Sequence, residues 1–181
     1  GMEPAVKLSV ELAGKGKILV MATPLTLKSV KFNDLVCRYR HQAEIKLLPC
    51  DGLVDIIEKD HTNEREINEY LSGVFSDIDK KDLSAVVLGC THYVLIKKEI
   101  AQLLGAEIRI IDGNYGTARR LKTVLQNECL LNSAMQEGLP VSAKSSVRFY
   151  MSGSEREVVA KYRQWLLAAG IVCESEFKCR R

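Results

Sequence analysis

A cysteine, a threonine and a histidine follow one another directly after an apolar run. Residues 85–88 (AVVL) are hydrophobic, Gly89 follows them, and Cys90, Thr91 and His92 come next. The apolar positions that follow recur at helical spacing, so the segment predicts a strand, a tight turn and a helix. A thiol on such a turn, with an imidazole two residues away, is readily shifted toward thiolate, the reactive form. The pattern suits a nucleophile or a base that removes a proton from carbon, and its alternative is a buried structural cysteine.

The elements around this turn alternate between strand and helix. Apolar runs predict strands at 17–22, 44–48, 85–88 and 106–111. Amphipathic segments predict helices at 3–12, 24–39, 53–58, 63–76 and 93–104, with a further helix that ends near 127. This alternation predicts an α/β fold, a parallel sheet with helices on both faces. After a polar linker at 127–146, strands are predicted at 147–151 and 171–177, with a helix at 154–169 between them.

Side chains that could do chemistry also follow the other predicted strands. Thr23 and Thr26 follow residues 17–22, and Cys50 follows residues 44–48. The carboxyl ends of parallel strands meet at one edge of a sheet, where ligands bind. The two threonines have helix capping as an alternative role. Glu58 lies in a charged stretch of the kind that is usually solvated surface.

The composition is that of an ordinary soluble globular protein. Of 181 residues, 46% are hydrophobic and 27% are charged, and the net charge of +3 is too small to indicate nucleic-acid binding. No apolar run reaches the ~20 residues of a membrane span, and no signal peptide opens the sequence, so we expect a cytoplasmic protein without a membrane partner. The six cysteines form no C-x-x-C pair, which favours reduced thiols and no structural metal.

Five segments together match the sequence patterns of one known family. They are Met2–Lys7 (MEPAVK), Ile18–Ser29 (ILVMATPLTLKS), Leu48–Glu58 (LPCDGLVDIIE), Leu88–Tyr93 (LGCTHY), and Ile111–Gly113 with Thr117–Arg120 (IDG, TARR). In this order they resemble the glutamate racemases, members of the cofactor-independent aspartate/glutamate racemase superfamily. Val94 departs from the pattern, since family members usually have Pro there. We expect little effect, because Val is tolerated at a first helical turn.

This resemblance implies an activity and a site. It implies an aspartate/glutamate racemase-like fold and interconversion of L- and D-glutamate for peptidoglycan synthesis, and hence a part in cell wall biogenesis and cell shape. It also implies proton transfer by two cysteines on opposite faces of the substrate Cα, with no cofactor and no metal. Cys90 corresponds to the second of these cysteines, His92 would assist it, and Glu58 would support His92. The substrate-binding residues that the resemblance implies are Thr91, Thr23 and Thr26.

The resemblance starts midway along the family pattern. The first catalytic cysteine of the family and a D-S motif precede the segments matched here, so we expect a C-terminal portion of a racemase. Residues 1–112 would be a racemase α/β domain that carries the second catalytic cysteine, and residues 113–181 the C-terminal segment of the other α/β domain. Open strand edges in such a remainder favour a homo-oligomer, and we expect a dimer.

Three alternatives stay open. An inactive racemase paralogue would bind an amino acid or a partner protein without exchanging the Cα proton. Another superfamily member, such as an aspartate or hydantoin racemase, fits the LGCTHY string together with Glu58 less well. Within the racemase hypothesis, Cys50 is the candidate for a substitute second base, because it too follows a strand.

Overall fold

The chain divides into two compact units. The computed structural model describes residues 2–14, 16–131, 146–151, 160, 162, 164–165 and 174–179. By its contacts the chain forms the units Gly1–Cys129 and Leu130–Arg181. The domain division that we expect at residue 112 stays a prediction. In the described part of the chain, no helix combines the length and the apolar character needed to cross a membrane.

A parallel sheet forms the centre of the first unit, and its strands are β1 (Lys17–Ala22), β2 (Glu44–Pro49), β3 (Leu83–Leu88) and β4 (Arg109–Ile111). All neighbours run parallel, in the order β2-β1-β3-β4. The chain goes from β1 outward to β2 and then returns across β1 to form β3. The carboxyl ends of β1 and β3 therefore flank the point where the strand order reverses, which is where ligands bind in sheets of this kind.

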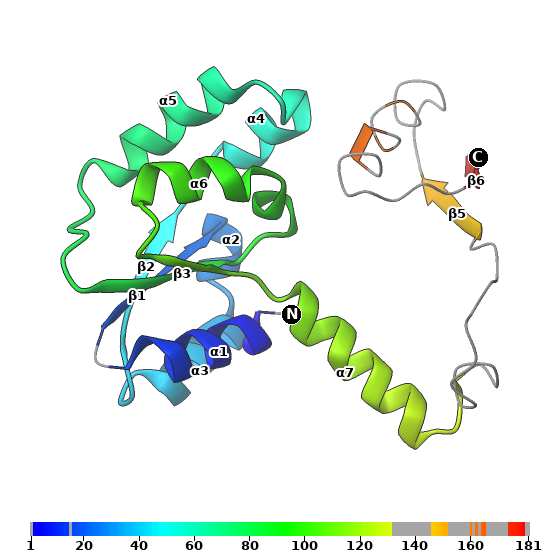
Figure 1. The fold of residues 1–181 in the computed structure, drawn as a ribbon, viewed down its shortest axis with the longest axis horizontal. Helices are drawn as coiled ribbons and strands as arrows, with labels where there is room; N and C mark the ends of the chain where they lie inside the picture. The colour runs from blue at the N-terminus through cyan, green and yellow to red at the C-terminus, as the bar shows by residue number, and fades with distance from the viewer. Residues whose placement is uncertain are drawn as a thin grey trace. The chain divides into compact units, whose positions relative to one another are not determined.

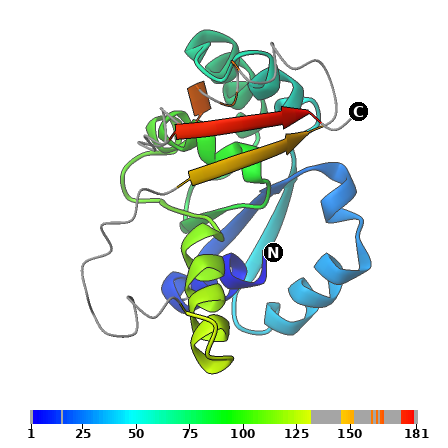
Figure 2. The ribbon, with the colours of Figure 1, turned by 90° about the vertical axis from the view of Figure 1, so that its right-hand side faces the viewer.

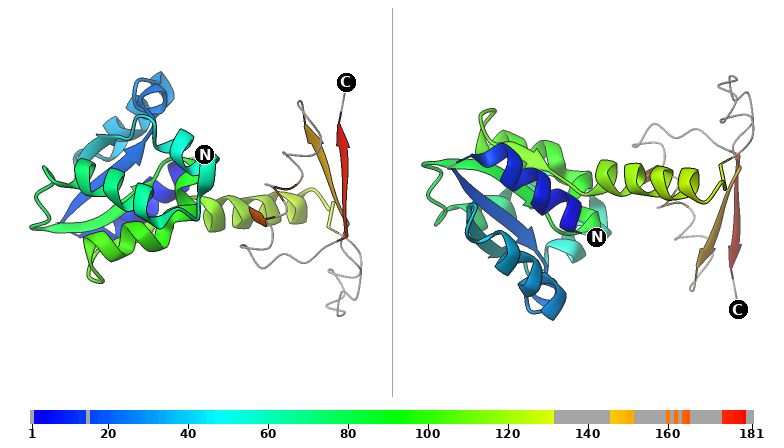
Figure 3. Two further views of the ribbon diagram at one scale, coloured as in Figure 1. Left: turned by 90° about the horizontal axis from the view of Figure 1, so that it is seen from above. Right: turned by 90° about the horizontal axis from the view of Figure 1, so that it is seen from below.

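Helices cover both faces of this sheet, as Figures 1 and 3 show. One face carries α4 (Leu53–Asp60), α5 (Glu64–Phe75) and α6 (Lys97–Leu104), and the other carries α1 (Glu3–Ala13) and α3 (Val30–Tyr39). Successive side chains of β1 alternate between the two layers: Leu19 and Met21 pack toward α4–α6, and Ile18 and Val20 pack toward α1 and α3. A strand buried on both faces must be apolar throughout, which explains the run at 17–22. The predicted α/β class is confirmed.

Two predicted helices are interrupted. The segment 24–39 contains α2 (Pro24–Leu27) and α3 rather than one helix, because Ser29 is extended and its Oγ accepts a hydrogen bond from the Phe32 N–H at 3.3 Å. That serine starts a new helix in the way an N-cap does. After Cys90, a 3₁₀ helix, η1 (Thr91–Ile96), precedes α6. The strand predicted at 106–111 is shorter than expected, since β4 covers three residues and the Ile108 N–H bonds the Gly105 carbonyl in a turn.

Among the described residues, α7 (Asn114–Asn127) completes the first unit, and the second unit contains a pair of strands. β5 (Ser146–Met151) and β6 (Glu174–Cys179) pair in parallel, side by side in Figure 2. β5 confirms the strand predicted at 147–151, whereas β6 overlaps the strand predicted at 171–177 and ends later. Most of the predicted linker and of the predicted helix at 154–169 lies outside the described residues.

Candidate active site

Gly89 places the turn after β3 directly against the end of β1. Its N–H donates to the Met21 carbonyl at 2.7 Å, which continues the hydrogen bonding between the two strands. A Cβ at Gly89 would lie 2.8 Å from that carbonyl oxygen and 2.9 Å from the Ala22 Cβ, closer than real Cβ atoms come. Only glycine allows the turn to lie this close to β1. Cys90, the next residue, is therefore placed at the switch point between β1 and β3.

Three side chains form a chain of contacts at this point. The Cys90 Sγ lies 3.7 Å from the His92 Nδ1, and the His92 Nε2 lies 2.6 Å from the Glu58 Oε1. His92 and Glu58 are partly exposed, with 26% and 35% of their side-chain surface accessible. The structure therefore brings together the three residues predicted as catalytic, although Glu58 is 34 residues away from His92 in the sequence.

The Glu58 carboxylate influences which ring nitrogen of His92 carries the proton. An ionised carboxylate only accepts hydrogen bonds, so the contact with Glu58 favours the tautomer in which Nε2 carries the proton and donates to Oε1. In that tautomer the lone pair of Nδ1 faces the Cys90 Sγ, 3.7 Å away, and can accept a hydrogen bond from the thiol. This order of carboxylate, imidazole and thiol is the arrangement that activates a cysteine.

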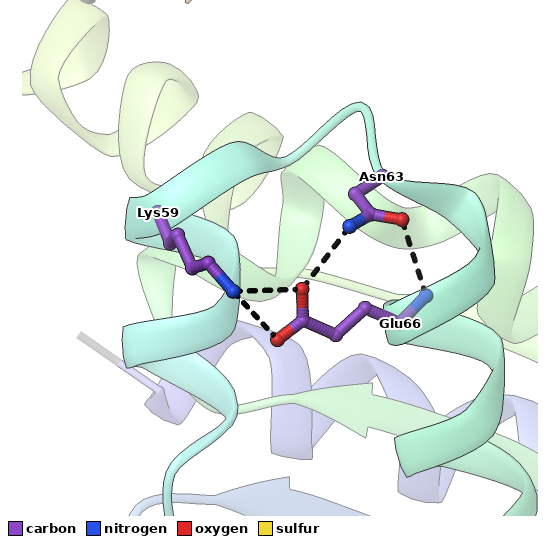
Figure 4. A network of polar contacts seen from close by, with 3 residues as sticks. All are labelled: Lys59, Asn63 and Glu66. Atoms are coloured by element: carbon purple, nitrogen blue, oxygen red, sulfur yellow. Dashed lines mark hydrogen bonds and ion pairs between the residues drawn. The ribbon is translucent and has the colours of Figure 1, made fainter.

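The ends of α4 fix the position of Glu58. Gly52 precedes the helix with a φ of 73°, a conformation that favours glycine, and the buried side chain of Ile57 anchors the turn that carries Glu58. The far end of α4 is tied to α5: Lys59 Nζ donates to both carboxylate oxygens of Glu66 at 3.2 Å. Asn63 completes the network of Figure 4, since its side chain donates to that carboxylate and accepts from the Glu66 N–H.

Two tyrosines hold the turn between β2 and α4. The buried Tyr93 hydroxyl donates to the Cys50 carbonyl at 3.2 Å, and the Tyr70 hydroxyl donates to the Asp51 carbonyl at 2.7 Å. Burial raises the pKa of Tyr93 well above its usual range and the pKa of Tyr70 to about 12, so both hydroxyls keep the proton they donate. Because Tyr93 follows His92, the elements that carry the imidazole and the carboxylate are joined.

Cys50 lies on the opposite side of β1 from Cys90. Its N–H donates to the Ala22 carbonyl, as the Gly89 N–H does to Met21, so the two cysteines are two strand spacings apart, about 9.5 Å. That separation exceeds the ~7 Å limit for the Cα atoms of a disulfide. Burial and the neighbouring Cys90 raise the pKa of the Cys50 thiol to about 12, despite the opposing effect of a hydrogen bond with Tyr93. The thiol is therefore protonated at neutral pH, which disfavours Cys50 as a thiolate base.

The raised pKa of Cys50 predicts an alkaline loss of stability. A thiol with a pKa near 9.0 when unfolded and about 12 when folded stabilises the fold fully below pH 9, and that contribution is lost as pH rises toward 12. Between pH 8 and pH 10.5 we expect the free energy of unfolding to fall by about 2 kcal/mol more in the wild type than in Cys50→Ala. Urea unfolding at the two pH values measures this difference. The exposed thiol of Cys37 gives the control, because Cys37→Ala should keep the full wild-type loss; an equal loss in Cys50→Ala would contradict the assignment.

The three predicted substrate-binding threonines fall in different places. Thr91 lines a pocket of about 130 Å³ together with Cys90. Thr23 follows β1 at the switch point, and its hydroxyl lies 2.9 Å from that of Thr26. Thr26 lines a separate pocket of about 380 Å³ between α1 and α3, and Met2 lines both pockets. The structure thus places Thr91 beside Cys90, but it does not bring Thr26 into the Cys90 pocket.

The far wall of the Cys90 pocket comes from the turn after β4, which the sequence did not indicate as part of the site. Asp112, Asn114 and Thr117 line that wall. Burial would raise the pKa of Asp112, but hydrogen bonds from the Lys97 side chain and from the Asn114 N–H hold it below its usual value. The sequence carried a signal for Asp112, because it directly follows a strand as Thr23 does. Among the described residues, no group of three or more His, Cys, Asp or Glu side chains is placed to hold a metal ion.

The fold and these contacts define a parallel α/β protein with a candidate site around Cys90 at the carboxyl edge of its sheet. Relatives of known sequence give the family. No family model matches the chain. A glutamate racemase of Clostridium novyi (strain NT) is 45% identical over 92% of the chain, and one of Clostridium acetobutylicum is 46% identical over 76%. The chain belongs to the glutamate racemase family, and it spans 62% and 54% of the length of these two relatives.

Solved structures agree on the fold. A glutamate racemase isoform of Bacillus anthracis superposes with a TM-score of 0.79 at 23% identity, covering 99% of this chain and 63% of that one. The glutamate racemase of Escherichia coli, in complex with L-glutamate and the activator UDP-MurNAc-ala, gives a TM-score of 0.70 at 24% identity. It covers 97% of this chain and 62% of that one. At these identities the likeness shows the fold alone.

Proposed function

We propose that this chain provides one catalytic face of a glutamate racemase. The observation that carries the proposal is the contact chain Glu58–His92–Cys90 at the switch point of the sheet, in which Cys90 and His92 belong to the LGCTHY segment. Family membership supports glutamate as the substrate. So do two solved relatives: that of Francisella tularensis is in complex with D-glutamate and that of Escherichia coli with L-glutamate.

The proposed reaction moves one proton at a time. His92, oriented by Glu58, accepts the thiol proton of Cys90, and the resulting thiolate removes the proton from the substrate Cα. The electron pair of the broken C–H bond stays on the substrate, next to its carboxylate, and Sγ becomes a thiol again. Return of a proton to the same face restores the starting enantiomer, whereas delivery by a second acid on the opposite face gives its mirror image. Thr91, which lines the Cys90 pocket, and Thr23, at the end of β1, would hold the substrate.

Solvent exchange tests this proposal. The chain is incubated with L-glutamate or with D-glutamate in D₂O, and the Cα proton signal is followed by NMR. We expect the signal of at least one enantiomer to disappear, because a proton taken by Cys90 exchanges with solvent before it returns. Binding of glutamate without any exchange by folded protein would contradict catalysis by this chain and favour the inactive binding paralogue.

Removal of the carboxylate should slow the exchange without removing it. Glu58→Gln keeps the size of the side chain but no longer fixes the Nε2 proton, so we expect the exchange rate to fall about 10- to 100-fold. Glu64→Gln is the matched control, because its carboxylate pairs with Lys98 at 3.7 Å on the surface. An unchanged rate in Glu58→Gln would show that the carboxylate plays no part in catalysis.

We also infer a cytoplasmic homodimer that serves peptidoglycan synthesis. β2 is an edge strand on which Leu47 is 42% exposed, and α7 exposes Tyr115 and Leu121 at 77% and 58%. Unpaired strand edges and exposed apolar side chains of this kind favour association. Light scattering of the purified chain measures the mass of the assembly, and a monomer at all concentrations would contradict the dimer.

A further inference from the structure

We propose that Lys97 and Asp112 form a clamp that fixes the width of the Cys90 pocket. Lys97 Nζ donates to the Asp112 Oδ2 at 3.0 Å. The carboxylate is the better buried partner, with 15% of the Asp112 side chain accessible against 44% for Lys97. The pair is thus a positioning device that acts on Cys90 through the pocket walls, and its functional meaning rests on the proposed role of Cys90.

The two charges belong to the two chain segments that line the pocket. Lys97 begins α6, directly after η1, so it belongs to the continuous segment that includes Cys90, Thr91 and Val94 of the first wall. Asp112 follows β4 and lies on the second wall with Asn114 and Thr117. The ion pair is thus a side-chain link between the two segments, and it lies beyond the last backbone pairing of β3 with β4, that of Val87 with Ile111.

The second wall is also held by the sheet and by α1. β4 pairs with β3 as far as Ile111, which directly precedes Asp112. Asp112 Oδ1 accepts from the Asn114 N–H at 3.0 Å and so shapes the start of α7. A Cβ at Gly116 would lie 2.6 Å from the Pro4 Cβ, so the first turn of α7 packs closely on α1. No residue of α7 is buried, and the hydrophobic core therefore does not hold this helix. The β3–β4 pairing fixes the start of this wall, and beyond it the wall is held by contact with α1 on one side and by the Lys97–Asp112 pair on the other.

The effect of the Lys97–Asp112 clamp can be measured as the rate at which Cys90 is alkylated, with no substrate present. Iodoacetamide transfers its carboxamidomethyl group to a thiolate sulfur and releases iodide, and peptide mass spectrometry gives the rate at Cys90 separately from the other cysteines. Loss of the clamp should let the walls separate and expose the sulfur. We expect Lys97→Met to raise the Cys90 rate by about threefold or more, since access controls thiol reactivity.

Further variants separate the effect of an unpaired charge on the Cys90 rate from the effect of the pocket width. The double variant Lys97→Met/Asp112→Asn also lacks the clamp but leaves no unpaired carboxylate, and it should show the same increase. Lys97→Arg retains the ion pair and should keep the wild-type rate. Lys98→Met is the matched control, because Lys98 pairs with Glu64 on the surface at 3.7 Å, and it should also match the wild type.

Wild-type rates of Cys90 alkylation in both Lys97→Met and the double variant would overturn the clamp. An increase in Lys97→Arg equal to that in Lys97→Met would overturn it as well. If circular dichroism shows that Lys97→Met does not fold, the reversed pair Lys97→Asp/Asp112→Lys decides instead: a wild-type rate supports the clamp and a raised rate contradicts it. Because no glutamate is present, failure of this test is distinct from failure of the proposed racemase activity.

Discussion

Cys90→Ala is expected to slow solvent exchange at the glutamate Cα severely. The thiolate is the group that removes the proton in the proposed reaction, and neither Thr91 nor His92 offers an equivalent base at the same position. General acid–base groups typically contribute 10²- to 10⁴-fold, so we expect the rate to fall by about a thousandfold. NMR in D₂O measures the rate for both enantiomers.

Cys37→Ala separates this effect from a general loss of thiols. Cys37 is an exposed free cysteine on α3, and its replacement should leave the exchange rate unchanged. Cys50→Ala should retain most of the rate as well, because the buried thiol is protonated at neutral pH. A rate in Cys90→Ala within about tenfold of the wild type would contradict the assignment of Cys90 as the base.

Gly89→Ala is expected to damage both the fold and the site. The added Cβ would meet the Met21 carbonyl oxygen and the Ala22 Cβ at less than 3.0 Å, and these atoms belong to a central strand that cannot move aside. Overpacking of this kind typically costs 1–3 kcal/mol, so we expect the free energy of unfolding to fall by about 2 kcal/mol. The exchange rate should fall with it, because Cys90 would be displaced from the switch point.

Gly73 provides the matched comparison for this substitution. It lies in α5, and a Cβ there would have no atom within 4 Å. Alanine is the better helix former, so Gly73→Ala should stabilise the protein by about 0.5–1 kcal/mol and leave exchange unchanged. Urea unfolding compares the two variants. Equal stability of Gly89→Ala and the wild type would show that the turn after β3 has room that the structure does not show.

The central strands could be predicted from the sequence because burial on both faces leaves a continuous apolar run. The runs at 17–22 and 85–88 have that property, and they correspond to β1 and β3. The break between α2 and α3 was missed, since Thr23 and Ser29 both cap helices and the sequence does not show that two caps act in succession. The 3₁₀ form of η1 was also missed, because apolar spacing alone does not separate it from an α-helix.

The residues of the site could be predicted from the sequence alone only where they are neighbours in one segment. Cys90, Thr91 and His92 are adjacent in the sequence, and their position after a strand could be read directly. The role of Glu58 came from family resemblance, because its position beside His92 depends on how α4 packs against η1. The Lys97–Asp112 pair was not foreseen, since a lysine at the start of a charged helix is typical of solvated surface.

The stereochemistry of exchange tests the central claim most directly. Glutamate recovered from D₂O is separated by chiral chromatography, and mass spectrometry measures deuterium in each enantiomer for the wild type and for Cys90→Ala. We predict that the wild-type chain deuterates one enantiomer with retention of configuration, since Cys90 acts on one face of Cα, and that Cys90→Ala does not. Deuterium that appears in the folded Cys90→Ala variant at the wild-type rate, or none at all with the folded wild type, would contradict Cys90 as the proton-transfer base.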